Sequence, residues 1–141
     1  MSKINLGRVL LGGIVAGIVA DIIDIPIDGM WLAPRWSFDM TRHGLAAAFS
    51  MKQLIAFNLI GIVGGIVTIW VYAAIRPRFG AGVKTAIHAG IVVWFLAALL
   101  PNLSFYVIHL LSRGLTLYTT LGALVEIVVG TVAGAALYKE A

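Results

Sequence analysis

The sequence predicts an all-α integral membrane protein, a bundle of four transmembrane helices. Of its 141 residues, 61% are hydrophobic and only 11% are charged, and four apolar stretches approach or exceed the length of a membrane span. Ordinary soluble domains carry roughly a quarter charged residues, whereas a span needs about 20 mainly apolar residues. The length allows one domain, residues 1–141, with no room for an appended catalytic domain.

All four spans are expected to be helices, because a lone strand would leave its backbone groups unpaired in lipid. They cover about residues 5–25, 54–75, 85–111 and 115–137. Lys3 and Arg8 precede the first apolar run, which we expect to be an uncleaved span rather than a signal peptide. Pro101 removes a backbone donor within the third span, so we expect a kink there.

The segment 28–53, between the first two spans, mixes aromatic and basic residues. Trp31 and Trp36 suit the outer interface belt, where amphipathic rings favour the headgroup region. We expect this interfacial loop to hold a short amphipathic helix resting on the membrane, rather than a lid over a binding site.

Basic residues divide unequally between the two ends of such a bundle. One end holds Lys3, Arg8, Arg76, Arg78, Lys84 and Lys139, and the other holds Arg35, Arg42, Lys52 and Arg113. Cytoplasmic loops carry the excess of Lys and Arg, so both termini are expected in the cytoplasm. The net charge of +4 is then a topology signal, and nucleic acid is not expected as a partner.

A further signal is the run WVYAAIRPRFG, residues 70–80, which joins the end of a span to a basic loop. Together with Trp94-Phe95, Leu124-Val125-Glu126 and the run 134–138, it resembles a family of small bacterial four-span membrane proteins. The resemblance covers the chain from about Gly12 onward. It implies a bacterial inner membrane and four spans, and it carries over no activity and no catalytic residues.

Each span carries one face of small or polar residues. On the first, Gly13, Gly17, Asp21, Asp24 and Asp28 fall within about 80° of arc, because a helix advances about 100° per residue. The faces on the later spans are Asn58, Gly61, Gly65, Thr68 and Tyr72; His88, Phe95, Leu99, Asn102 and Tyr106; and Thr119, Gly122, Glu126, Gly130 and Ala133. Small residues let helices approach closely, and ionisable groups turn toward the bundle or water.

The first span has a second small-residue face, formed by Gly12, Ala16 and Ala20. These seams exceed what one compact bundle needs, so a homo-oligomer is expected, with a larger membrane complex as the alternative. Gly17 is expected to pack within the protomer and the Gly12 face between protomers.

The depth of the polar residues in the membrane predicts where an ion or proton would bind. Asp21, Asp24 and Asn58 lie in the outer half, and Glu126 lies near the midplane, which predicts an acidic vestibule narrowing to a glutamate. A charge at midplane depth costs about 2.5–3.5 kcal/mol on insertion scales, so Glu126 is expected to be protonated or reached by water. Accessory candidates are Asn102, His88 and His109.

Two structural alternatives stand beside this prediction. Asp21 and Asp24 would merely cap a helix that ends at Pro26, or Glu126 would form a hydrogen bond to another span. Several chemistries are also excluded or disfavoured. There is no cysteine, which excludes disulfides and Cys-ligated metal centres. His88 and His109 are 21 residues apart on one span, roughly 30 Å, so they cannot share a haem.

No cofactor is expected, the identity of any bound metal stays open, and a binding role is favoured over catalysis. The leading hypothesis is a small membrane protein that binds or passes a small cation or proton through an outward-facing acidic cavity. The alternatives are a non-catalytic membrane subunit or assembly partner, and a lipid- or quinone-binding protein that uses Glu126 with a nearby histidine.

Overall fold

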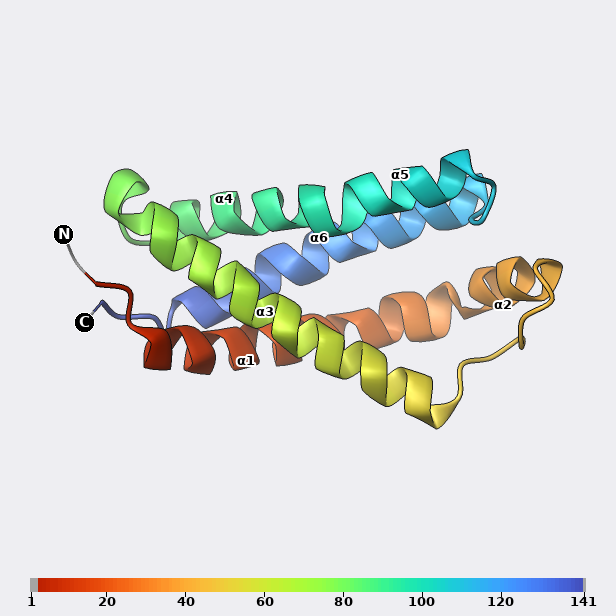
Figure 1. Cartoon of the computed structure of the whole chain (residues 1–141), viewed down its shortest axis with the longest axis horizontal. Helices are drawn as coiled ribbons and strands as arrows, with labels where there is room; N and C mark the ends of the chain where they lie inside the picture. The colour runs from red at the N-terminus through yellow and green to blue at the C-terminus, as the bar shows by residue number, and fades with distance from the viewer. Residues whose placement is uncertain (1–2, 141) are drawn as a thin grey trace.

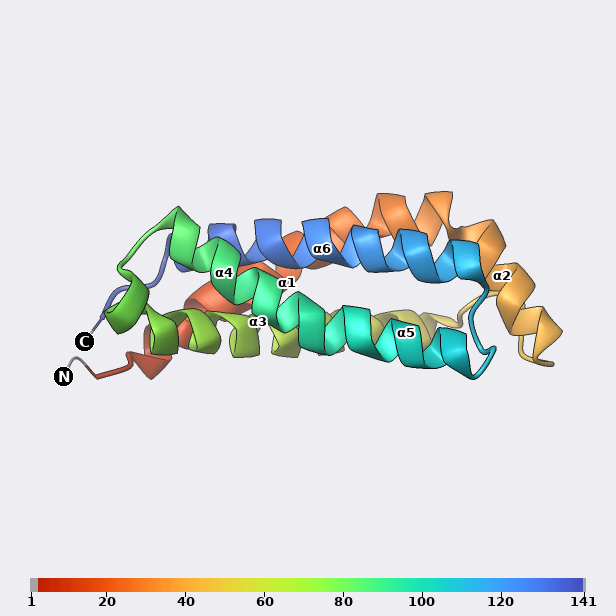
Figure 2. The same ribbon diagram turned by 90° about the horizontal axis from the view of Figure 1, so that it is seen from above.

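Four long apolar helices pack against one another in the computed structural model, which describes residues 3–140 (Figures 1 and 2). They cover Leu6–Trp31, Met51–Phe79, Val83–Val107 and Arg113–Ala135. Each is long and apolar enough to cross a membrane, so the prediction of a four-span helical bundle is confirmed. The two chain ends and the turn between the second and third spans lie at one end of the bundle.

The first span extends past its predicted end at residue 25. It consists of α1 (Leu6–Asp24) followed by a π-helical segment, Ile25–Trp31. The alternative in which the helix ends at Pro26 is wrong, because the backbone changes its pairing there instead of stopping. The N–H of Leu32 donates to the Ile27 carbonyl, five residues back, at 2.8 Å. Asp21, Asp24 and Asp28 therefore all lie on one continuous span.

The third span changes pairing in the same way close to its proline. Here α4 (Val83–Trp94) leads into a π-helical segment, Phe95–Leu99, and then into α5 (Leu100–Val107) with Pro101 in its first turn. The span ends before its predicted end at residue 111, and residues 108–112 form a turn instead. His109 has a positive φ of 59° in this turn, which places it outside the helix.

Segment 28–53 is mostly structured. It contains the last turn of the first span, the amphipathic helix α2 (Ala33–Arg42) and the start of α3 (Met51–Phe79), so only Leu32 and residues 43–50 lack a helix. The expected short helix is confirmed. α3 begins earlier than predicted because Ser50 caps it: the Gln53 N–H donates to Ser50 Oγ at 3.3 Å, and the Ser50 N–H donates to Gln53 Oε1 at 2.8 Å. The fourth span, α6, is Arg113–Ala135, two residues ahead of the prediction at each end.

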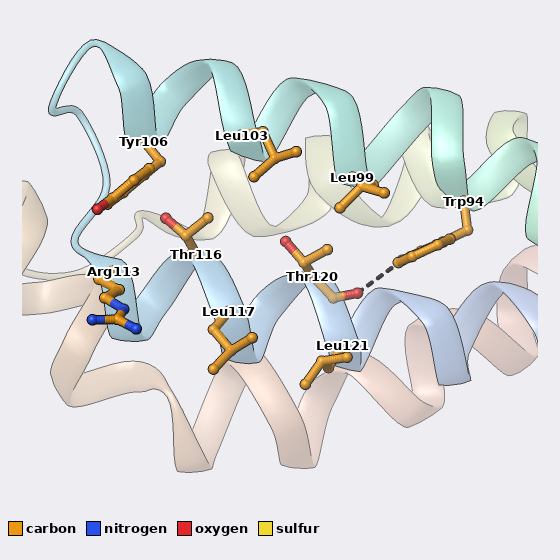
Figure 3. Close-up of a pocket in the computed structure, with 9 residues that line it drawn as sticks. All are labelled: Trp94, Leu99, Leu103, Tyr106, Arg113, Thr116, Leu117, Thr120 and Leu121. Atoms are coloured by element: carbon orange, nitrogen blue, oxygen red, sulfur yellow. Dashed lines mark hydrogen bonds between the residues drawn. The ribbon is translucent and has the colours of Figure 1, made fainter.

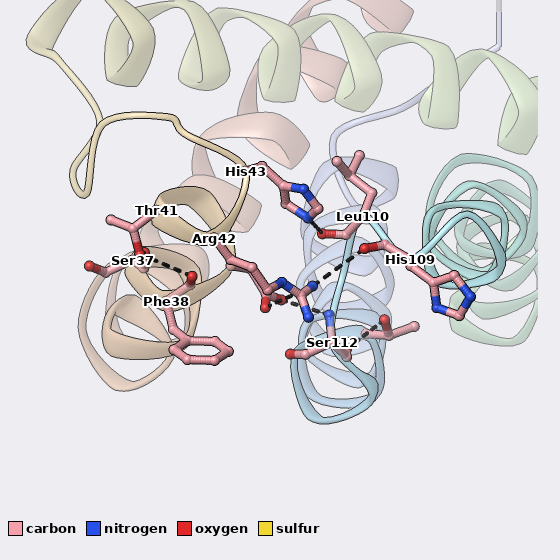
Figure 4. A network of polar contacts seen from close by, with 10 residues as sticks. Ser37, Phe38, Thr41, Arg42, His43, His109, Leu110 and Ser112 are labelled. Carbon is pink, nitrogen blue, oxygen red and sulfur yellow. Dashed lines mark hydrogen bonds and ion pairs between the residues drawn. The ribbon is translucent and has the colours of Figure 1, made fainter.

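Polar contacts tie α2 to the turn that precedes α6 (Figure 4). Buried Asp39 accepts a hydrogen bond from the Ser112 N–H at 2.7 Å and pairs with Arg42 at 3.3 Å. Arg42 and His43 reach the carbonyl oxygens of His109 and Leu110. α2 is thereby held against the bundle rather than lying apart from it.

The predicted seam of the first span packs against α3. A methyl group added at Gly17 would lie 2.9 Å from the Gly61 carbonyl oxygen and would overlap Ile62, and one added at Gly13 would overlap Ile66. The backbones therefore meet with no side chain between them at these positions. The expectation that Gly17 packs within the protomer is confirmed.

The second small-residue face packs within the same chain, against α6. A methyl group added at Gly12 would lie 2.6 Å from the Gly134 carbonyl oxygen, and one added at Gly130 would lie 2.5 Å from the Ala16 carbonyl oxygen. The expectation that the Gly12 face serves association between protomers is therefore wrong. These small residues are used because α1 lies between two helices, α3 and α6, and approaches both closely.

An apolar core fills the bundle at the end where the termini lie. Its buried members include Val9, Ile69, Tyr72, Ala86 and Tyr138. At the other end α3 diverges: its residues 51–60 are all exposed, and within the described residues it has no contact with α5 (Figure 1). The bundle is thus closed at one end and open along one side at the other.

Replacing single glycines by alanine should measure these close approaches. Gly12→Ala and Gly17→Ala should each lower the free energy of unfolding by about 1–3 kcal/mol, because the added methyl meets backbone. Gly64→Ala is the matched control, since no atom of residues 3–140 lies within 4 Å of its added methyl and alanine favours a helix. Thermal unfolding in detergent would report the difference. Equal stability of the three variants would contradict the packing.

Candidate functional site

A cavity of about 640 Å³ lies between α1, α3, the middle of the third span and α6. Most of its wall is apolar, but eight polar side chains line it as well. They are Asp21, Asp24, Asp28, Asn58, Thr68, Thr119, Glu126 and Thr131. The four residues predicted to form the ion or proton site, Asp21, Asp24, Asn58 and Glu126, are all among them.

The pairing of α1 with α6 brings Glu126 to this cavity. The two helices run in opposite directions, so the contacts Gly12–Gly134 and Ala16–Gly130 step along both by four residues. Continuing this pattern by four more residues along each helix places Ala20 opposite Glu126. Asp24 lies one turn farther along the first span. Close packing at the closed end of the bundle thus fixes which carboxylates face each other in its middle.

Glu126 is the most enclosed acid of the cavity. Only 9% of its surface is exposed, and its Oε1 is buried without a hydrogen-bond partner among the described residues. Leaving a buried polar atom unpaired costs about 1–3 kcal/mol. The alternative in which Glu126 serves as a hydrogen bond between spans therefore has no support in the described part of the chain.

Three carboxylates meet at this point. Asp24, Asp28 and Glu126 each contribute one carboxylate oxygen, and these three oxygens lie within 4.8 Å of one another. Oxygen ligands of a hard cation such as Ca²⁺ lie about 2.3–2.6 Å from the ion, so oxygens at this spacing can bind one cation between them. Asp28 is held in place by Trp36, whose Nε1–H donates to Asp28 Oδ1 at 2.7 Å.

The glycines around the cluster leave space for the carboxylates. Asp21 is half-buried and lies directly on Gly61, where an added methyl would overlap Asp21 Oδ1. On the opposite wall, a methyl added at Gly122 would lie 3.4 Å from Glu126 Oε1 and 3.7 Å from Asp28 Oδ2. Gly61 therefore leaves space for Asp21, and Gly122 leaves space for Glu126 and Asp28.

Asn58 lies toward the open side of the cavity. Its side chain is exposed, and its Nδ2 donates to the Leu54 carbonyl of its own helix at 2.8 Å. The exposure follows from the divergence of α3, which carries this residue away from the third span. Asn58 lines the cavity without joining the carboxylate cluster.

The accessory candidates do not reach the cavity. Asn102 donates to Thr120 Oγ1 at 2.9 Å, and His88 is exposed beside Phe79 with ring centroids 5.9 Å apart. His109 lies in the turn after α5, where its carbonyl accepts a hydrogen bond from Arg42. Because no histidine of the described chain lines the cavity, the pairing of Glu126 with a histidine that a quinone site requires is missing.

A second, smaller pocket of about 350 Å³ lies between α5 and α6 (Figure 3). Leucines dominate its wall, Tyr106 and Arg113 lie at one end, and the Nε1–H of Trp94 donates to the Thr120 carbonyl at the other. None of the predicted site residues lines it. Its apolar wall and its lack of carboxylates among the described residues separate it from the acidic cavity.

Sequence reasoning missed two members of the site, Asp28 and Trp36. Asp28 shares the helical face of Asp21 and Asp24, and this shared face is the signal in the sequence that points to it. Trp36 was assigned to the interface belt, and only the fold of α2 brings its N–H to Asp28. The alternative in which Asp21 and Asp24 cap a helix end is wrong, since the helix continues to Trp31.

The fold and this site define a class: a multi-pass helical membrane protein with a carboxylate cluster in an internal cavity. Comparison of the chain with protein-family models, with curated proteins and with solved structures gives no match. The function must therefore be argued from the site itself.

The Trp36–Asp28 hydrogen bond yields a direct test. Trp36→Phe keeps an aromatic ring but removes the donor, so the free energy of unfolding should fall by about 1 kcal/mol. Trp31→Phe is the matched control, because Trp31 is 61% exposed and packs only edge-on against Tyr118. Thermal unfolding of both variants in detergent would measure the effect. A larger loss in Trp31→Phe than in Trp36→Phe would contradict the role of this bond.

Proposed function

We propose that the protein binds a small cation or proton in the acidic cavity and passes it across a bacterial inner membrane. The observation that carries the proposal is the buried Glu126 Oε1, unpaired among the described residues and close to oxygens of Asp24 and Asp28. No Lys or Arg of the described chain lines the cavity, so a positive ligand is the group that would balance these carboxylates.

Each acid has a distinct part in this proposal. Glu126 is the central site, because it is the most buried of these acids and its Oε1 has no hydrogen-bond partner among residues 3–140. Asp24 is exposed and Asp28 is half-buried, so they complete the ligand set on the more accessible side of Glu126. Asp21 and Asn58 lie along the approach, where a carboxylate attracts cations before they reach the cluster.

Passage requires a second opening. The cavity ends at Ala16, Thr68 and Thr131, beyond which the apolar core around Ile69 and Tyr72 fills the bundle. A cation would leave toward the termini only if α3 or α6 moved relative to α1. The geometry therefore favours a single binding site that opens first to one side of the membrane and then to the other, rather than a continuous pore.

Orientation belongs to the same proposal. With more basic residues at the end that holds the termini, that end faces the cytoplasm and the open side of the cavity lies nearer the outer surface. The cavity would then accept cations from outside.

A second candidate function is a non-catalytic subunit or assembly partner of a membrane complex, a homo-oligomer included. The uncovered half of α3 favours it: Leu54, Phe57 and Ile60 are exposed on a helix whose other half is packed. Under this alternative the flux of cations would be absent and a partner would cover residues 51–60.

Glu126→Gln separates these functions. Gln keeps the shape of the side chain but cannot titrate or carry charge, so cation or proton flux in proteoliposomes should fall to the level of empty vesicles. Thermal stability should change by less than about 1 kcal/mol, since no hydrogen bond of Glu126 is lost among the described residues. Glu140→Gln is the matched control, because Glu140 pairs with Arg76 at the other end of the bundle.

The two outcomes are distinct. Full flux in the triple variant Asp21→Asn, Asp24→Asn and Glu126→Gln would end the transport proposal. Flux absent from the unaltered protein with every cation tried would favour the assembly partner instead.

Labelling of single cysteines tests the orientation, and the lack of native cysteine keeps the background low. Ala46→Cys lies in the exposed loop before α3, and Ala81→Cys lies in the exposed turn before α4. An impermeant maleimide added to intact cells should label Ala46→Cys only. Labelling of Ala81→Cys alone would reverse the orientation, and the cavity would then open toward the cytoplasm.

A further inference from the structure

The acidic cavity is larger than an inorganic cation needs. Its volume of about 640 Å³ lies within the usual range of small-molecule pockets. The carboxylate cluster of Asp24, Asp28 and Glu126 occupies only one part of it. The remaining volume is lined mainly by apolar groups.

Aromatic rings line the cavity beside the carboxylate cluster, where Trp36 donates its Nε1–H to Asp28. Trp36, Phe49 and Phe57 all line it. Their rings contact one another edge to face, with centroids 6.1 Å apart for Trp36–Phe49 and 5.2 Å apart for Phe49–Phe57. Aromatic faces attract organic cations and pack against apolar bodies. A hydrated metal ion would gain nothing from this wall.

The side of the cavity is open where α3 diverges. Leu54 and Phe57 line the cavity and are nevertheless 42% and 50% exposed. Within the described residues, α3 contacts α1, α4 and α6 but not α5, so no helix covers this edge. In a membrane-spanning bundle that edge faces acyl chains, which gives an amphiphile dissolved in the bilayer a direct route to the carboxylates.

We propose that the ligand of the cavity is an amphiphilic organic cation, with its positive charge at Asp24, Asp28 and Glu126 and its apolar body against Trp36, Phe49 and Phe57. This inference rests on the proposed function, since it assigns the class of cation to the same site. Charge decides the choice of occupant: Glu126 Oε1 is buried and unpaired, the residue is nine-tenths buried, and no cationic side chain of the described chain lines the cavity. A ligand without a positive charge would leave the negative charge of these carboxylates uncompensated.

Tetraphenylphosphonium and tetraphenylborate provide the test, because they share one shape and carry opposite charges. Equilibrium dialysis of the purified protein in a neutral detergent, corrected for detergent alone, should show saturable binding of tetraphenylphosphonium and none of tetraphenylborate. Glu126→Gln and Asp24→Asn should each weaken binding about tenfold, because each removes one negative charge that attracts the bound cation. Phe57→Ala should weaken it about fivefold.

The control variant is Phe105→Ala, which removes an exposed aromatic ring of α5 outside the cavity and should leave binding unchanged. Thermal unfolding of each variant separates loss of the ligand from loss of the fold, and Asp24→Asn alters an exposed side chain, so it keeps the test usable if Glu126→Gln unfolds.

Binding of both probes alike would overturn the inference, because the cavity would then be an uncharged apolar groove. If tetraphenylphosphonium does not bind but inorganic cation flux depends on Glu126, the inference is rejected and the proposed function stands. If the probe does not bind and the Phe57→Cys variant forms efficient disulfide cross-links between two copies, the inference is rejected. The open edge is then covered by a second copy of the chain. Charge-dependent binding without any flux would support the ligand class and reject passage.

Discussion

The structure depends on the close approach of α1 to two helices at once. Gly13 and Gly17 admit the backbone of α3, and Gly12 with Ala16 admits Gly134 and Gly130 of α6. In lipid no hydrophobic force drives helices together, so close van der Waals contact between small residues must supply much of the association. Since α1 is fixed on two sides, every residue farther along the same span has a defined neighbour. The position of the carboxylate cluster follows from this packing.

Beyond its glycines the same span carries acidic residues. These residues serve the candidate site but do not help the helices to pack. Asp21, Asp24 and Asp28 lie where a packing side chain would otherwise fill the bundle, and Gly61 and Gly122 leave room beside them. An apolar side chain at Glu126 would remove the unpaired oxygen and, on packing grounds alone, would suit the bundle better. Retention of an acid there is understandable if a ligand supplies the missing partner.

Much of this arrangement is predictable from the sequence, and the failures have physical causes. Helical periodicity predicted the faces of Gly13 and Gly17 and of Thr119, Gly122 and Glu126, because each face is a local property of one helix. The end of the first span was placed wrongly, because a proline can be accommodated by pairing five residues back, as the Leu32 N–H does with Ile27. The role of Trp36 and the exposure of Asn58 depend on where α2 folds back and where α3 diverges. Those are long-range features that no single stretch encodes.

The position of α1 between α3 and α6 also has a consequence for how the protein is made. The ribosome delivers the amino-terminal spans first, so α1 and α3 can pair through Gly13, Gly17 and Gly65 while the last span is still being synthesised. During that interval the Gly12 face has no partner, and three aspartates of the first span stand in the membrane without their fourth acid. Because α6 supplies Glu126 and part of the cavity wall, the cavity is complete only once this last span has packed. We therefore expect the first three spans to pass through a stage in which the aspartates of the first span lie beside α3 without Glu126.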